Sequence, residues 1–208
     1  MELSEEARTH LREIVERLAW RQTASINALG HSLKFVTELD VKRRIAGELD
    51  LHMRLFGRVR ELYADLGWDD LQAVVRVDMD RVRYPQTRME FGCAYYVTGL
   101  AEVQSMASYG ECVCKPFADI AAAYVETAEE RPSPTRFLAF AAEEGNRPRA
   151  QEILSTWYTV ALETFTLREG ADERVQELGL RAETTDELVE AYRERLAPFL
   201  SESGLQLP

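Results

Sequence analysis

Glu48 and His52 are two metal-binding residue types that lie four positions apart in a stretch with the pattern of a long helix. Side chains at i and i+4 lie one above the other on a helix, so both can reach one ion. Helical bundles build two-metal centres from a Glu on each of two helices and a Glu-x-x-His pair on each of the other two. The pair here has the wider i+4 spacing. The alternative is a hydrogen-bonded core histidine, because a buried imidazole needs partners for its nitrogens.

Two further carboxylates, Glu102 and Glu130, are candidate metal ligands from other helical stretches. Glu102 shares a helical face with aromatic and small residues, and its alternative role is pairing with an arginine or a tyrosine. Glu130 shares a face with Glu126 near the end of its stretch. A second Glu-x-x-His pair is not completed there, because Ser133 stands three residues after Glu130 and Pro132 breaks the turn.

The remaining candidates for metal ligands are weaker. Gln22 is the inward polar residue of the first helical stretch, and its neutral amide binds metal less well than a carboxylate does. Cys112 and Cys114 are spaced too tightly for a Cys-x-x-Cys zinc site and lack a second pair, so buried thiols are the better interpretation. The sequence therefore predicts an incomplete ligand set.

Composition limits the classes of partner. The chain has 208 residues, with 25 Lys and Arg against 36 Asp and Glu, and its net charge of −11 disfavours nucleic acid and anionic membranes. Its 3 cysteines are an odd number, which fits a reducing compartment better than a disulfide framework. The N-terminus lacks the pattern of a signal peptide, and no stretch approaches the ~20 apolar residues of a membrane span. We therefore expect a soluble, cytoplasmic protein.

The spacing of apolar residues predicts helices throughout the chain. A capping box at Thr37 to Asp40 is expected to open the second helix, and a crossover, for which a strand is the alternative, is expected over 68–85. The predicted fold class is all-α, one domain over 1–208 with a four-helix core. The expected helices cover about 4–36, 37–66, 87–114, 116–130, 134–145, 148–168 and 184–203.

Several stretches resemble the phenylacetic acid catabolic family, the ferritin-like subunits of phenylacetyl-CoA epoxidase. Ser108-Tyr109-Gly110 leading into Pro116-Phe117-Ala118 is similar to the passage between the third and fourth helices of the catalytic subunit. The segment 149–165, which contains Trp157-Tyr158, is similar to its tryptophan-rich helix, and 185–208 resembles its ending.

The resemblance implies a ferritin-like four-helix bundle with additional C-terminal helices. In that family the catalytic subunit binds two irons, activates dioxygen and epoxidises the ring of an aromatic CoA thioester. The metal ligands it implies here are Glu48 and His52, Glu102 or Thr98 from the third helix, and Glu129 or Glu130 from the fourth. The histidine that the family carries on the fourth helix is absent from this chain.

Two functions follow as hypotheses. The first is a subunit of a multicomponent oxygenase of aromatic catabolism, with a di-iron or partial iron site and an external electron donor. The second is a noncatalytic structural or interaction subunit of the same fold, without a cofactor. Both predict association with related oxygenase subunits or self-association, and Val74-Val75 in the crossover offers an apolar surface for it.

Overall fold

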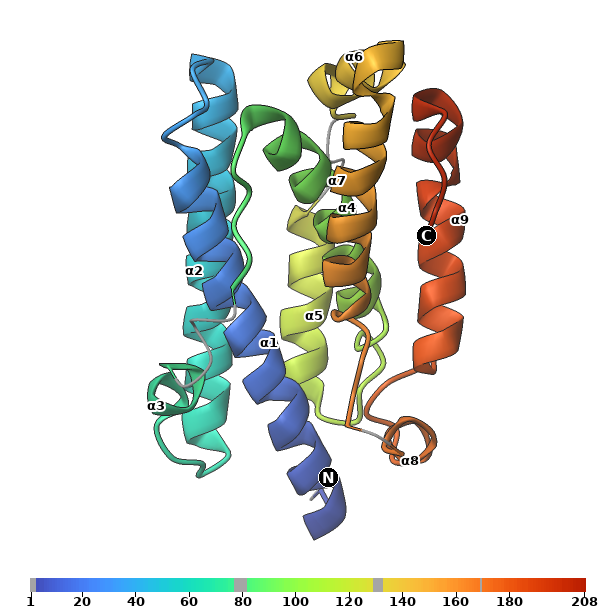
Figure 1. The fold of residues 1–208 in the computed structure, drawn as a ribbon. Coiled ribbons are helices and arrows are strands. Elements are labelled where there is room, and N and C mark those ends of the chain that lie inside the picture. The colour runs from blue at the N-terminus through green and yellow to red at the C-terminus, as the bar shows by residue number, and fades with distance from the viewer. Residues whose placement is uncertain (1–2, 77–81, 129–132, 169) are drawn as a thin grey trace.

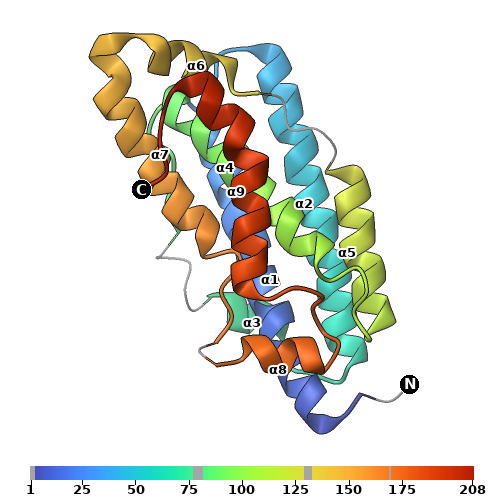
Figure 2. The same ribbon diagram turned by 90° about the vertical axis from the view of Figure 1, so that its right-hand side faces the viewer.

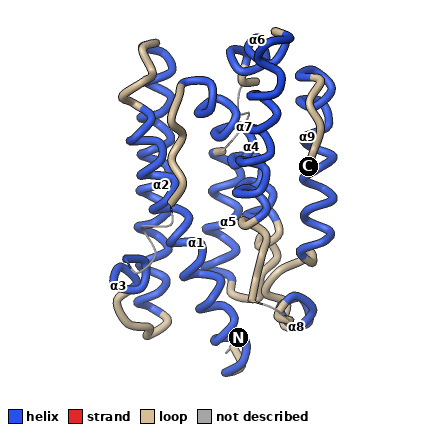
Figure 3. Tube along the Cα trace, viewed as in Figure 1, coloured by secondary structure: helices blue, strands red, loops and turns tan. Residues whose placement is uncertain are grey.

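The computed structural model describes residues 3–76, 82–128, 133–168 and 170–208 (Figure 1). These residues form helices and no strand, which confirms the all-α prediction for the described part of the chain (Figure 3). The helices are α1 (Glu5–Ser32), α2 (Leu39–Asp65), α3 (Leu71–Arg76), α4 (Arg88–Ala107), α5 (Lys115–Thr127), α6 (Thr135–Ala142), α7 (Arg147–Leu162), α8 (Asp172–Glu177) and α9 (Thr185–Ser203), with a 3-10 turn at Glu144–Asn146.

Helix α4 lies between two groups of helices. The long helices α1 and α2 pack along each other, α2 packs on α5, and α5 packs on α4 (Figures 1 and 2). On its other side α4 packs against α6, α7 and α9. Within α4 every residue except Ala107 is buried or half-buried. The helix therefore takes part in two hydrophobic cores, one shared with α1, α2 and α5 and one shared with α6, α7 and α9.

Local capping explains where three of the helices begin. Ser4 accepts a hydrogen bond from the Ala7 amide at 3.1 Å, and Thr87 accepts one from the Glu90 amide at 3.1 Å. Such side chains satisfy amides that the first helical turn leaves without partners. Thr184 and Glu187 form a capping box at the start of α9, at the position predicted from the sequence.

The capping box predicted at Thr37 to Asp40 is wrong. Helix α2 begins after Glu38, and no side chain caps its first turn. The Glu38 carboxylate instead accepts from the Thr37 amide at 3.0 Å and pairs with Arg88 at 3.3 Å and Arg136 at 2.9 Å. Contacts to α4 and α6 therefore decide the conformation at this helix start.

Several helices are shorter than predicted from the sequence. Helix α4 ends at Ala107 and α5 begins at Lys115, because backbone turns replace the helix between them and the Val113 amide donates to the Gly179 carbonyl at 2.9 Å. Pro116 does lie in the first turn of its helix, as expected. The predicted crossover contains the short helix α3, and its residues 77–81 lie outside the described residues. Helix α8 was not predicted.

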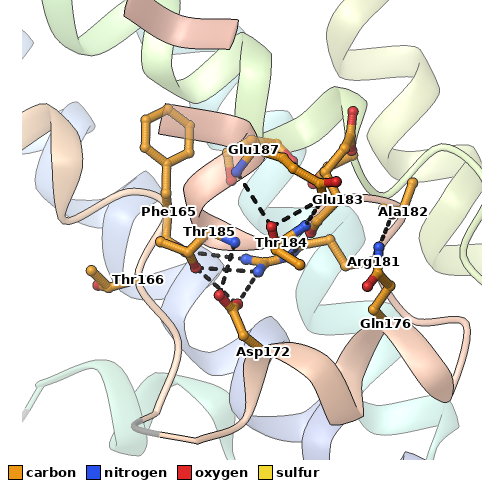
Figure 4. A network of polar contacts seen from close by, with 12 residues as sticks. Phe165, Thr166, Asp172, Gln176, Arg181, Ala182, Glu183, Thr184, Thr185 and Glu187 are labelled. Carbon is orange, nitrogen blue, oxygen red and sulfur yellow. Dashed lines mark hydrogen bonds and ion pairs between the residues drawn. The ribbon is translucent and has the colours of Figure 1, made fainter. Parts of the chain in front are cut away.

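A buried arginine joins the connection after α7 to α8 and α9 (Figure 4). Arg181 is 2% exposed, pairs with Asp172, and donates to the backbone carbonyls of Phe165 at 3.1 Å and Glu183 at 2.7 Å. Asp172 also accepts from the Thr185 amide at 2.8 Å. A buried guanidinium is tolerated when a counter-ion and acceptors surround it, so this network fixes the position of α9.

We expect Asp172→Asn to lower the free energy of unfolding by about 3 kcal/mol, because it leaves the Arg181 guanidinium buried without its counter-ion. Glu6→Gln is the matched control: it removes an exposed partner of Arg174, and we expect a much smaller loss, because solvent screens this ion pair. Urea unfolding of both variants measures the difference. Equal losses in the two variants would show that the Arg181 network is not a main stabilising contact.

Stability should also fall in acid through Glu38. Hydrogen bonds from its own amide and the Thr37 amide, together with the charge of Arg88, lower the pKa of this carboxyl from 4.5 to about 2. A carboxyl with a lowered pKa stabilises the fold above its ordinary pKa, and this contribution is lost as the pH falls through the folded value. The difference in unfolding free energy between wild type and Glu38→Gln should therefore shrink from pH 5 to about pH 2. The exposed Glu126→Gln should show no such trend.

Candidate functional site

His52 lies at the centre of a polar cluster inside the helical bundle. The side chain is 1% exposed, and its Nδ1 lies 2.5 Å from the Oε1 of Gln22 on α1. Its Nε2 lies 3.9 Å from Glu48 Oε2 on the same helix and 3.9 Å from Glu102 Oε2 on α4. The structure thus brings together Glu48, His52 and Glu102, three of the residues singled out in the sequence.

Glu102 is held by hydroxyl groups from two other helices. Ser25 on α1 donates to Glu102 Oε1 at 2.6 Å, and Tyr124 on α5 donates to Glu102 Oε2 at 3.0 Å. The His52 and Tyr124 rings also lie close, with centroids 6.1 Å apart. Helices α1, α2, α4 and α5 therefore each contribute a side chain to the cluster.

The Gln22 contact fixes which nitrogen of His52 carries a proton. A carboxamide oxygen only accepts hydrogen bonds, so the Nδ1 that contacts it must donate. In the neutral imidazole this leaves a lone pair on Nε2, directed at the side where Glu48 and Glu102 lie. A nitrogen lone pair and two carboxylates around one point attract a cation. That cation can be a metal ion or a proton on Nε2.

The cluster offers candidate ligands for one metal ion and not for two. An ion with bonds of about 2.1 Å can join donor atoms up to ~4.2 Å apart, which covers both 3.9 Å separations. One imidazole and two carboxylates suit iron or manganese. Among the described residues, however, no group of three or more His, Cys, Asp or Glu side chains has an arrangement that could hold a metal ion. The residue of α1 that contacts His52 is Gln22, whose side chain is a neutral amide and not a carboxylate.

The described residues test only some of the other predicted ligands. Glu129 and Glu130 lie outside the described residues, so their role as ligands stays a prediction. Glu126 is exposed. The Thr98 hydroxyl donates to the Ala94 carbonyl of its own helix at 2.8 Å and is the weaker alternative to Glu102.

A small pocket of about 50 Å³ lies directly beside the cluster. Most of its wall is apolar, and His52 and Glu102 supply polar atoms. Trp157 on α7 closes one side, and its indole donates to the Glu90 carboxylate at 3.2 Å. The full lining is Ser25, Ala28, Leu29, His52, Pro85, Phe91, Ala94, Tyr95, Thr98, Glu102 and Trp157.

Three partners in and around the cluster were not predicted. Ser25 lies three residues after Gln22, and this helical spacing would have placed both on one face. Tyr124 lies in a stretch that was correctly expected to be helical, but no local pattern connects it to Glu102. The contact between Glu90 and Trp157 joins residues that are 67 positions apart, so it depends on the packing of α4 against α7.

The cysteines are buried and free, as expected. Burial raises the pKa of Cys112 to about 11 and raises the pKa of Cys93 well above its ordinary value, so both stay protonated at neutral pH. None of the three lies in the lining of the pocket beside His52.

Comparison with known proteins does not assign the chain to a family: no family model matches it, and no curated protein matches it. Separately, none of the helices in the described ranges combines the length and the apolar character needed to cross a bilayer.

Replacing Gln22 should destabilise the fold, because the buried His52 then lacks its hydrogen-bond acceptor. In Gln22→Leu the Nδ1–H of His52 loses its acceptor, and we expect the free energy of unfolding to fall by about 2 kcal/mol. Thr23→Val is the control, because that hydroxyl contacts only the Ala19 carbonyl of its own helix, and a change within about 0.5 kcal/mol is expected. Thermal and urea unfolding measure both. A Gln22→Leu protein as stable as wild type would contradict this assignment of the hydrogen bond.

Proposed function

We propose that this chain is a metal-binding, ferritin-like protein of the multicomponent oxygenase type. Its centre takes one iron ion through Glu48, His52 and Glu102, and the adjoining pocket receives an apolar, aromatic substrate. The observation that carries the proposal is the position of His52 Nε2, 3.9 Å from a carboxylate oxygen of each glutamate and oriented by Gln22.

The surrounding residues support this role through their hydrogen bonds. Metal-bound histidines characteristically donate their other N–H to an oxygen, which fixes the tautomer and makes the imidazole a better ligand. Gln22 supplies that oxygen for His52. Ser25 and Tyr124 hold the Glu102 carboxylate in place, because each donates a hydrogen bond to one of its two oxygens.

A bound iron ion would supply the capacity to activate dioxygen for insertion into the substrate. The chain's own residues provide the surroundings for that chemistry. The wall of the pocket is mostly apolar, and the aromatic rings of Phe91 and Trp157 offer flat surfaces for an aromatic substrate. Two of the proposed ligands, His52 and Glu102, line the pocket, so a molecule in the pocket lies against the ion's ligands.

The second candidate is a noncatalytic subunit that serves as a structural or interaction partner. One observation favours it: both oxygens of Glu102 accept hydrogen bonds from protein hydroxyls, so the cluster is partly satisfied without an ion. In this case His52 carries a proton on Nε2 and pairs with the two glutamates. Both candidates imply a partner protein, because an oxygenase of this type needs an electron donor and a scaffold needs a subunit to support.

Metal titration separates the two. Under anaerobic conditions we expect the wild-type protein to bind one Fe²⁺ per chain, and His52→Ala and Glu102→Gln each to weaken binding by about 100-fold, because each removes a ligand. Elemental analysis after gel filtration and calorimetric titration measure this. Fe²⁺ binding below a tenth of an equivalent, or two equivalents per chain, would contradict the one-ion proposal; no binding supports the noncatalytic subunit.

His10→Ala is the matched control for the titration. His10 Nδ1 lies 3.9 Å from Glu13 Oε2, so it forms a histidine–glutamate contact of the same length but closer to the surface. Its removal should leave iron binding unchanged. Circular dichroism of each variant at the titration temperature verifies that lost binding does not reflect unfolding.

A further inference from the structure

The pocket beside Glu102 is part of a longer groove between α1 and α7. Pocket and groove share five lining residues, Ser25, Ala28, Thr98, Glu102 and Trp157. Beyond them the groove follows α1 past Trp20 and Arg21 and follows the end of α7 past Thr159 and Glu163. A ligand longer than the pocket can therefore extend from Glu102 toward Arg21.

Arg21 is a half-buried cation on the wall of this groove. Its guanidinium donates to the Glu163 backbone carbonyl at 2.9 Å, and within the described ranges it forms no ion pair with a carboxylate. Burial lowers the pKa of Arg21 to about 10, and the negative charge of Glu102 opposes this lowering. The contrast is Arg168 on the same groove, whose guanidinium pairs with Glu13 at 3.6 Å.

The neighbouring Trp20 adds a second donor that lacks an acceptor. Its side chain lines the same groove, and its indole nitrogen is buried with no hydrogen-bond partner among the described residues. Buried donors without acceptors are uncommon, because each loses its hydrogen bond to water on folding. Two adjacent residues of α1 thus offer more donor capacity than the described protein atoms use.

We propose that Arg21 binds the anionic group, a carboxylate or a phosphate ester, of an elongated ligand whose apolar end lies in the pocket between Glu102 and Trp157. This rests on the proposed function in one respect, that the pocket is the substrate site. A guanidinium can hold either oxyanion through two parallel N–H donors, and it does so more strongly where water is partly excluded.

The charges along the groove also fix the direction in which such a ligand binds. The outer part of the groove carries Arg21 without a carboxylate partner among the described residues, whereas Arg168 there is paired with Glu13, so Arg21 is the cation that attracts an anionic group. At the inner end the described lining of the pocket contains no cation of this kind, and Glu102 lines its wall. The net charge of −11 repels anions from the molecule as a whole, so specific capture needs a local cation of this kind. The apolar end of the ligand is then directed toward His52.

Calorimetric titration with three probes tests the proposal on the full chain: 4-phenylbutanoate, 4-phenylbutyl phosphate and the neutral 4-phenylbutanamide. We expect at least one anion to bind about tenfold more tightly than the amide, and Arg21→Gln to remove this preference. The tighter anion identifies the group that the site prefers. Arg21→Lys keeps the charge but not the two-pronged donor, so an intermediate affinity is expected.

Arg17→Gln is the matched control, because Arg17 lines the same groove, is exposed and donates to the Thr166 carbonyl. It should keep the preference for anions. Equal affinity for anions and amide, no binding of any probe, or the same loss in Arg17→Gln and Arg21→Gln would overturn the proposal. If Arg21→Gln does not fold, Arg21→Lys is used to test the proposal. An Arg21→Lys protein that binds the anions as tightly as the wild type does would overturn it.

Iron titration of the same preparations keeps the two proposals separate. Arg21→Gln should bind Fe²⁺ as the wild type does, because Arg21 is not among the ligands. Iron binding without anion preference refutes only the Arg21 site. Anion preference without iron binding refutes the metal proposal and leaves the anion site standing.

Discussion

The burial of α4 from two sides is the constraint on which the rest of the structure depends. Helix α4 packs against α5 and shares a hydrophobic core with α1 and α2 on one side, and it packs against α6, α7 and α9 on the other, which leaves little of its surface to water. Its polar side chains must therefore find partners inside the protein. Glu90 does so with the Trp157 indole and the Gln86 amide, and Glu102 with Ser25 and Tyr124.

Burying these polar side chains in an otherwise apolar interior costs free energy of folding. A buried imidazole and two carboxylates stabilise a fold less than well-packed apolar residues of similar volume would. Such clusters concentrate at functional sites, because function needs groups that packing alone would not select. This is the physical argument for the proposal that places the site at His52 and not at the buried, protonated cysteines.

Both groups of helices around α4 also contribute to the pocket beside the cluster. The apolar pocket lies where α4 faces both α1 and α7, so its walls come from both sides of the central helix. The Arg181 network holds the chain between α7 and α9, and Phe165, whose carbonyl accepts from Arg181, lies in the connection that also borders the groove through Glu163 and Thr164. Stability of this connection and the shape of the groove are therefore linked.

Local sequence determined the helical fold class, the capping box at Thr184 and the pairing of Glu48 with His52 on one face, because all three depend on residues within about one helical turn. Tertiary structure alone decided the rest of the site. Gln22 reaches His52 across 30 positions and Glu102 meets Ser25 across 77 positions, and no local pattern encodes such contacts. The failed capping box at Thr37 has the same cause: Arg88 and Arg136, from α4 and α6, attract the Glu38 carboxylate and override the local preference.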